Sequence, residues 1–197
     1  GVFDDDRYFD VQAEYAKAGP NDILVRITIS NRGPEAAHID VLPTLWFRNN
    51  WSWGRKGEGY GDKPSLTIDD GGFEAKHETL GAFRLDADVG PAGLAPELLL
   101  TDNETNAAKL FGSATAKHPK DAFVDYVVSG DDSGLCRDGA GTKGAARYAL
   151  DIAGGQDVVL RLRLTQDGIR GADDTAPFGD FDAIFEQRIA EADAFYA

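Results

Sequence analysis

The residues of this sequence that are best suited to binding chemistry lie together in one short stretch. Residues 42–54 have the sequence Leu-Pro-Thr-Leu-Trp-Phe-Arg-Asn-Asn-Trp-Ser-Trp-Gly and contain all three tryptophans of the chain. We call this stretch the tryptophan segment. An indole ring can cover the apolar face of a sugar, while amides and a guanidinium donate hydrogen bonds to its hydroxyl groups. The candidate contact residues are Trp46, Arg48, Asn49, Asn50, Trp51 and Trp53.

The same residue types fit two other interpretations. Trp and Arg are favoured anchors between protein surfaces, so the segment also suits a contact with another domain. A core strand that runs into a packed turn is the simplest alternative. If the backbone stays extended, Trp51 and Trp53 point to the same side, because side chains alternate along a strand. The sequence leaves the three interpretations open.

The elements around the tryptophan segment are predicted to be mainly strands. Residues 8–16 and 23–30 alternate apolar and polar side chains on either side of a turn at 19–22, which predicts an antiparallel hairpin. The side chains expected to face the core are Phe9, Val11, Ala13, Tyr15, Ile23, Val25, Ile27 and Ile29. A third strand is expected over residues 37–47. Pro43 lies inside it and indicates an edge position or a bulge just before the tryptophans.

Further strands are predicted over residues 65–68, 73–79, 81–89 and 97–101, whereas 107–111 and 122–128 fit either helix or strand. Residues 145–152 and 158–164 are predicted to form a last hairpin across Gly154 and Gly155. In its second strand Arg161 and Arg163 are expected to point outward. After Asp180, a predicted N-cap, apolar residues with helical spacing predict an amphipathic helix.

These elements predict an all-β chain, an antiparallel β-sandwich followed by a C-terminal amphipathic helix. The expected organisation is a β-sandwich domain over residues 1–167 and a linker with the helix over residues 168–197. The glycine-rich residues 54–63 are predicted to form an exposed flap beside the tryptophan segment.

Composition limits the classes of partner. The chain has 197 residues and a formal net charge of −14, which argues against nucleic acid and against anionic membranes, since both demand a positive surface. No apolar run reaches the length of a membrane span, and the N-terminus lacks the pattern of a signal peptide. The chain contains no methionine, so Gly1 is not expected to be a native start. Localisation stays open.

The sequence singles out no catalytic residue, metal site or cofactor. His38, His77 and His118 are far apart, without metal-ligand spacing. Cys136, the single cysteine, has no sequence neighbour that would activate it. The run Asp4-Asp5-Asp6 is expected to be solvated, because no calcium-loop spacing follows it.

The chain resembles bacterial proteins related to the processing α-glucosidase I family, glycoside hydrolase family 63. Besides the tryptophan segment, which is its most specific part, the stretches similar to that family are residues 3–11, 14–18, 31–37, 141–146 and 181–196. The resemblance implies a β-sandwich of the large super-sandwich type, followed in the parent protein by a helical (α/α) barrel. Because the family also has sequence upstream of the equivalent of Gly1, the sandwich is expected to be incomplete in this chain. In such enzymes the two catalytic carboxylates lie on the barrel, so no catalytic residue is expected in this chain.

The resulting hypothesis is a non-catalytic N-terminal domain of a glycoside hydrolase. Its expected partners are its own C-terminal barrel, which it braces, and an α-linked oligosaccharide near the tryptophan segment. Two alternatives remain: a free-standing carbohydrate-binding module and an immunoglobulin-like structural or adhesion module.

Overall fold

The structure, a computed structural model, describes residues 3, 7–55, 57, 60–114, 116–137, 139–169 and 176–197. The chain divides into two compact units. The first unit comprises Gly1–Ile39, Arg84–Pro96 and Ala149–Ala197, and the second comprises Asp40–Phe83 and Glu97–Tyr148. The predicted solvated run Asp4-Asp5-Asp6 lies outside the described residues.

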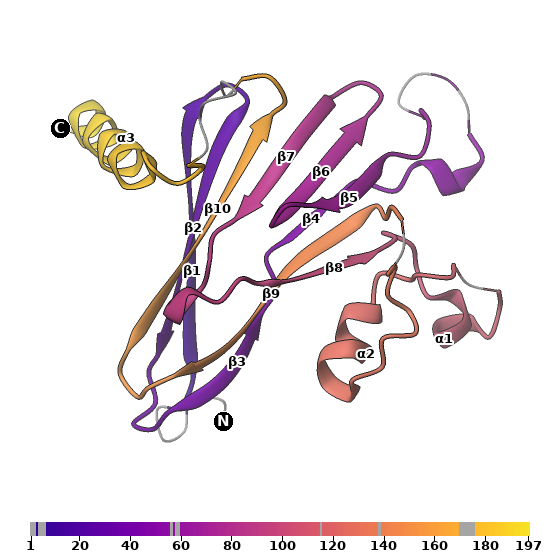
Figure 1. Cartoon of the computed structure of the whole chain (residues 1–197), viewed down its shortest axis with the longest axis horizontal. Coiled ribbons are helices and arrows are strands. Elements are labelled where there is room, and N and C mark those ends of the chain that lie inside the picture. The colour runs from indigo at the N-terminus through magenta and orange to yellow at the C-terminus, as the bar shows by residue number, and fades with distance from the viewer. Residues whose placement is uncertain are drawn as a thin grey trace. The chain divides into compact units, whose positions relative to one another are not determined.

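Strands make up most of the regular structure (Figure 1). The strands are β1 (Phe9–Gly19), β2 (Asp22–Asn31), β3 (Ala37–Val41), β4 (Thr44–Trp46), β5 (Ser65–Asp69), β6 (Gly72–His77), β7 (Gly81–Ala87), β8 (Glu97–Thr101), β9 (Lys143–Ile152) and β10 (Asp157–Gln166). The helices are η2 (Trp51–Trp53), η3 (Pro91–Gly93), α1 (Ala107–Phe111), α2 (Ala122–Ser129) and α3 (Phe181–Tyr196).

The strands form two antiparallel sheets, and the predicted all-β, sandwich-like fold class is confirmed. One sheet has the order β1-β2-β10-β7-β6-β5, and the other has the order β3-β9-β4 with β8 also paired to β9. The two ambiguous segments of the sequence are both helical, as α1 and α2.

The predicted last hairpin is wrong. β9 and β10 follow each other in the sequence, but β10 pairs with β2 while β9 pairs with β4 and β8. The turn between them is held against the end of β2, where the Gly155 N–H donates to the Asn31 carbonyl at 2.9 Å. A Cβ on Gly154 would lie 2.3 Å from the Pro34 carbonyl oxygen, so only glycine allows this approach. The connection therefore moves the chain from one sheet to the other.

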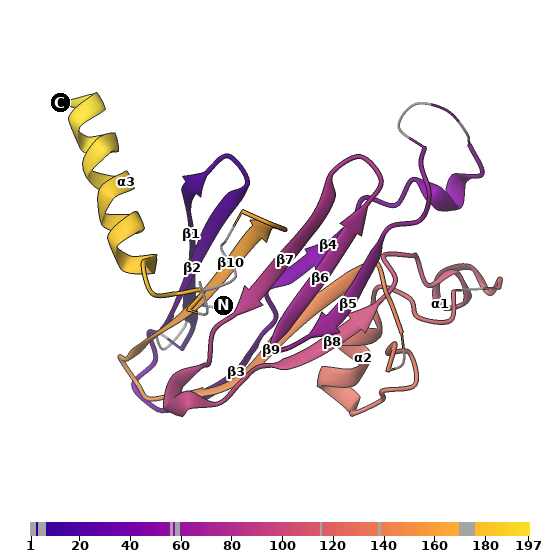
Figure 2. The ribbon, with the colours of Figure 1, turned by 45° about the horizontal axis from the view of Figure 1, so that its top comes forward.

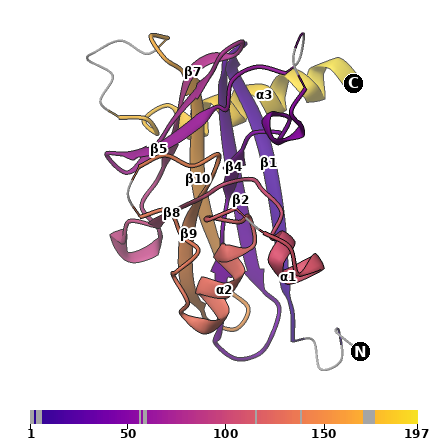
Figure 3. The ribbon, with the colours of Figure 1, turned by 90° about the vertical axis from the view of Figure 1, so that its right-hand side faces the viewer.

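In the first unit, β1, β2 and β10 lie side by side (Figure 3). The predicted hairpin of β1 and β2 is confirmed, with Ala13 opposite Ile27. The prediction that Val11 and Tyr15 face the core is wrong, because 56% of Val11 and 72% of Tyr15 are exposed. β1 is the outer strand of its sheet and is paired only with β2. At an edge, alternation alone does not say which face is covered.

Helix α3 covers the face of the β1–β2 hairpin that lies opposite to Val11 and Tyr15. Phe181 and Phe185 are buried against Ala16 of β1 and Leu24 of β2. The Arg26 guanidinium lies 4.3 Å from the centre of the Phe185 ring. The apolar stripe of α3 then continues beyond these contacts, where Phe195 is 81% exposed. In Figures 1 and 2 the C-terminal end of α3 points away from β1 and β2.

A buried arginine joins α3 to the sheet. The prediction that Arg163 points outward is wrong: its side chain is only 4% exposed and forms a bidentate pair with Asp22, with nitrogen–oxygen distances of 2.8 and 2.7 Å. It also donates to the Asp180 carboxylate at 2.6 Å and to the Pro177 carbonyl at 2.9 Å. Asp180 does precede α3, but its side chain makes no cap hydrogen bond. Its carboxylate binds Arg163 instead.

The predicted linker, residues 168–179, lies partly outside the described residues because 170–175 are not described. The boundary between the predicted 1–167 domain and the 168–197 segment therefore stays a prediction.

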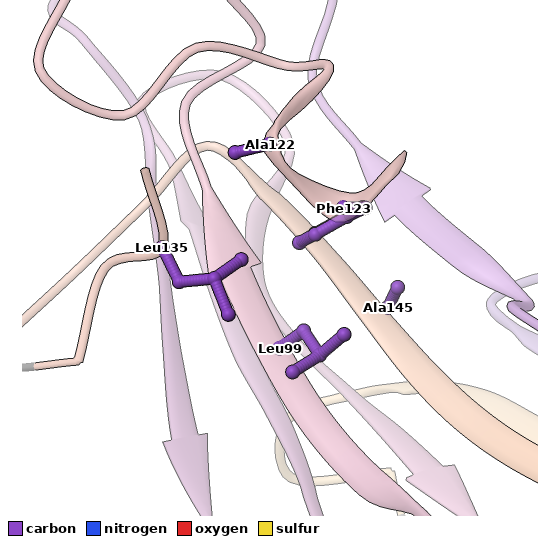
Figure 4. Packing of buried hydrophobic residues seen from close by; sticks show 5 residues of the cluster. All are labelled: Leu99, Ala122, Phe123, Leu135 and Ala145. Atoms are coloured by element: carbon purple, nitrogen blue, oxygen red, sulfur yellow. The ribbon is translucent and has the colours of Figure 1, made fainter. Parts of the chain in front are cut away.

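The second unit has its own core. Leu99 of β8, Ala145 of β9, Leu135, and Ala122 and Phe123 of α2 form one buried cluster. Figure 4 shows Phe123 directed from α2 toward the two strands. Phe73 of β6 is fully buried, and a Cβ on Gly144 of β9 would lie 2.7 Å from its ring. Strand β9 is thus packed too closely at this point for any larger residue.

Pro43 breaks the predicted third strand in two. β3 ends at Val41 and β4 begins at Thr44, because proline has no N–H for the ladder. The Pro43 carbonyl still accepts a hydrogen bond from the Ala146 N–H at 3.1 Å. The sequence predicts one strand with an edge position or a bulge at Pro43; the structure instead has two strands separated at this proline.

Candidate functional site

The tryptophan segment includes strand β4, which pairs with the first residues of β9. Trp46 lies opposite Lys143 in the antiparallel ladder, and its side chain is 56% exposed. The Phe47 N–H donates to the Thr142 carbonyl at 3.1 Å, and the Phe47 ring stacks on His77 at 5.5 Å between ring centres. The segment therefore leaves the sheet from a fixed position.

After Phe47 the backbone turns into the 3₁₀ helix η2. The Asn49 side-chain oxygen accepts hydrogen bonds from the Ser52 N–H at 3.2 Å and the Ser52 hydroxyl at 2.8 Å. Gly54 ends the turn at a φ of 64°, a left-handed conformation that glycine adopts without strain. Asn50 directly precedes η2 and is half-buried.

The helical turn separates the two later tryptophans. The extended backbone under which Trp51 and Trp53 would share a side is not formed, because a 3₁₀ helix has three residues per turn. Trp51 is half-buried, and its indole N–H donates to the Glu104 carboxylate at 3.1 Å. Trp53 is 52% exposed. Only Trp53 of this pair presents much of its ring to solvent.

Hydrogen bonds tie the segment to the loop that follows β8. The Asn49 amide donates to the Asn103 carbonyl at 3.0 Å, and the Asn103 amide donates back to the Phe47 carbonyl at 2.8 Å. The Asn103 N–H is itself held by the Thr142 hydroxyl at 2.7 Å. With the bond from Trp51 to Glu104, these contacts hold both loops in one arrangement.

Cationic and aromatic side chains surround Trp53. The guanidinium carbons of Arg48 and Arg55 each lie 6.0 Å from the centre of its ring, within the range of a cation–π contact. Tyr60 lies 6.2 Å from Trp53 between ring centres and accepts a hydrogen bond from Arg55 at 3.1 Å. Gly54, Arg55 and Gly57 are exposed, which agrees with the predicted flap in the part of residues 54–63 that the structure describes.

Trp53 also lines a pocket of about 580 Å³, which we call the Trp53 pocket. Its volume lies within the range of small-molecule sites, about 300–1,000 Å³. Its lining residues are Asn49, Ser52, Trp53, Asn103, Glu104, Thr105, Ala107, Ala114, Ala116 and Lys120. Most of them are polar, so the pocket combines an indole with many hydrogen-bonding groups.

Two lysines of the second unit, Lys120 and Lys143, lie close together. Lys143 donates to the Lys120 carbonyl at 2.8 Å and lies 4.8 Å from the centre of the Phe123 ring. Burial lowers the pKa of Lys143 first, and the charge of Lys120 lowers it further, while Asp121 opposes both.

The structure brings only some of the candidates together. Asn49 and Trp53 line the Trp53 pocket, Arg48 lies over Trp53, and Trp51 supports the pocket through Glu104. Trp46 lies on β4 and is not part of the lining. The sequence analysis missed Asn103, Glu104 and Lys120, which lie far along the chain and carry no motif. Only the pairing of β9 with both β4 and β8 brings them near.

The histidines and the cysteine that the sequence analysis considered make contacts within the fold. His38 lies 3.1 Å from Asp151, and His118 lies 3.2 Å from the Gly134 carbonyl. Cys136 is buried, and its thiol donates to the Ala140 carbonyl. Among the residues that the structure describes, no group of three or more His, Cys, Asp or Glu side chains is arranged to hold a metal ion. In that same part of the chain, none of the helices has the length and apolar character needed to span a membrane.

No protein-family model matches the chain. The chain is 32% identical over 222 aligned positions to a protein of Saccharomyces cerevisiae (strain ATCC 204508 / S288c) named "Uncharacterized protein YMR196W". The alignment covers 98% of this chain and 20% of the yeast protein. The chain therefore spans about a fifth of the length of the curated relative that it matches.

Proposed function

We propose that this chain is a non-catalytic β-sandwich module of a longer glycoside hydrolase of the α-glucosidase type. In this proposal its tryptophan segment contacts an α-linked oligosaccharide beside the catalytic barrel, which the module braces. The observation that carries the proposal is the Trp53 pocket, in which a half-exposed indole adjoins a lining of mostly polar side chains. We assign the module no catalytic residue.

The pocket has the chemistry that a sugar ring requires. A ring with several hydroxyl groups presents donors and acceptors at its edge and C–H groups on its faces. Glu104 offers carboxylate oxygens, Lys120 offers an ammonium group, and Trp53 offers an aromatic face. Because Asn49 and Trp51 are already hydrogen-bonded to the loop after β8, the pocket is preformed, and binding orders few side chains.

Two features support a module within a longer protein. The yeast relative is about five times as long as the part that this chain matches. Helix α3 buries its first turns in this chain, whereas Ile189, Phe195 and Tyr196 are exposed farther along. An apolar helix face that continues past its own domain suits contact with a neighbouring domain.

A free-standing carbohydrate-binding module is the second candidate, and one observation favours it. The described residues that line the Trp53 pocket all belong to the second unit, so one compact unit of the chain forms the pocket. Sugar binding would then require no barrel. The two candidates differ in whether the isolated chain binds sugar as tightly as the longer protein does.

The test is a tryptophan-fluorescence titration of this chain with neutral α-linked gluco- and manno-oligosaccharides. We expect a saturable change that Trp53→Ala abolishes and that Trp46→Ala, the control outside the pocket, retains. Hydrolysis of α-glucosides is expected from the longer protein and not from this chain. Binding that survives Trp53→Ala, or no binding across the panel, contradicts the assigned site.

A further inference from the structure

The arginines around Trp53 differ from the other arginines of this chain. The other arginines in the described part, nine in all, each form an ion pair with a carboxylate: Arg7, Arg26, Arg32, Arg84, Arg137, Arg147, Arg161, Arg163 and Arg188. Within the described residues, Arg48 and Arg55 have no carboxylate at ion-pair distance. Both are exposed, and both contact the same indole.

That neither arginine has a carboxylate partner in the described part of the chain is notable because the chain is strongly acidic. It has 34 Asp and Glu residues against 20 Lys and Arg residues, so a carboxylate is the most available neighbour for any arginine. Each of the two guanidinium groups is exposed beside Trp53 without a carboxylate partner among the described residues, so an anion that binds either of them gains a charge-assisted hydrogen bond.

The acidic groups near the pocket do not neutralise these arginines. Asp102 pairs with Lys63 at 2.9 Å, and Asp121 pairs with Lys109 at 3.4 Å. Glu104 accepts the indole N–H of Trp51 and is the only acidic side chain in the described lining, where Lys120 balances its charge. Among the residues that the structure describes, no acidic side chain therefore compensates the positive charge of Arg48 and Arg55 beside Trp53.

We infer that the Trp53 pocket takes an acidic saccharide, whose sugar ring contacts Trp53 and whose carboxylate or phosphate binds Arg48 and Arg55. The inference rests on the proposed function and specifies its ligand class. Guanidinium groups bind both anions through paired N–H donors, so the chemistry on the protein side is the same for the two. The indole and polar lining select a sugar over a simple anion.

The experiment compares three probes by isothermal titration calorimetry: maltotriose, the same trisaccharide with a terminal glucuronate, and maltotriose 6-phosphate. We expect at least one acidic probe to bind about tenfold more tightly than maltotriose, the effect expected of one charge-assisted hydrogen bond. The preference should weaken as salt is raised. The stronger of the two acidic probes identifies the anion.

Arg48→Gln and Arg55→Gln test the assignment, with Arg7→Gln as the control, since Arg7 is also exposed but pairs with Glu35 in the other unit. We expect the ratio of the two dissociation constants to fall toward one in the first two variants and to stay unchanged in the control. Equal binding of neutral and acidic probes overturns this inference and leaves the proposed function standing. A preference that survives both substitutions overturns the role of the arginines. No binding of any probe counts against the proposed function itself.

Discussion

The bonds of Arg163 give the sharpest stability prediction. Its guanidinium is buried and forms two short bonds to Asp22, whose side chain is 9% exposed. Asp22 raises the pKa of Arg163 above its ordinary value, although burial opposes this shift. Arg163→Met keeps much of the aliphatic length and, among the described side chains, leaves the Asp22 carboxylate with the Thr165 hydroxyl alone, 3.4 Å away. Removing one partner of a buried pair costs about 3–5 kcal/mol.

The matched control is Asp180→Asn. Asp180 also pairs with Arg163, but its side chain is 55% exposed, and an exposed pair is worth about 0–1 kcal/mol. Urea unfolding followed by far-UV circular dichroism measures both variants. With a slope of roughly 2–3 kcal/mol per M urea, Arg163→Met should lower the midpoint by about 1–2.5 M, and Asp180→Asn should lower it by less than about 0.5 M. Equal shifts for the two variants would refute the reasoning.

Three further outcomes follow from the structure. Gly144→Ala should cost about 1–3 kcal/mol by urea unfolding, because its Cβ would lie 2.7 Å from the buried Phe73 ring, whereas Gly19→Ala, with no atom within 4 Å, should cost almost nothing. Hydrogen bonds from Arg26 lower the pKa of Glu14 below its ordinary value of 4.5, so this pair stabilises the fold above about pH 4.5 and is lost as the pH falls through the lower folded pKa. Glu14→Gln should therefore flatten the loss of stability in acid; an unchanged pH profile would count against the pair. Trp51→Phe removes the bond to Glu104 and should speed tryptic cleavage after Arg48 or Arg55, while Trp46→Phe should leave the cleavage rate unchanged.

Local patterns were sufficient for most elements of the fold. Alternation predicted β1, β2 and β10, and the strands predicted over residues 65–68 and 73–79 are found as the antiparallel pair β5 and β6. Alternation could not tell which face of β1 is covered, because that depends on strand order and on α3. It also placed Arg163 outside, since the sequence does not show that Asp22 and Asp180 meet it in space.

The candidate site was predictable only in part. The clustered indoles indicated Trp53 and the neighbouring Arg48. The sequence did not show that Asn49 bonds Ser52 and turns the backbone into η2, which separates Trp51 from Trp53. Glu104 and Lys120 were beyond prediction, because long-range pairing of β9 with β4 and β8 brings their loops to the segment.

The most direct test of the account follows the three indole N–H groups separately. In a ¹H–¹⁵N correlation spectrum of the labelled chain, each tryptophan gives its own indole signal, assigned by Trp→Phe substitution. During titration with an α-linked trisaccharide, neutral or acidic, the account predicts a saturable shift of the Trp53 signal, while the Trp46 signal, outside the pocket, stays in place. A saturable shift of Trp46 without Trp53, or no shift in any of the three signals, would contradict the claim that the Trp53 pocket binds sugar.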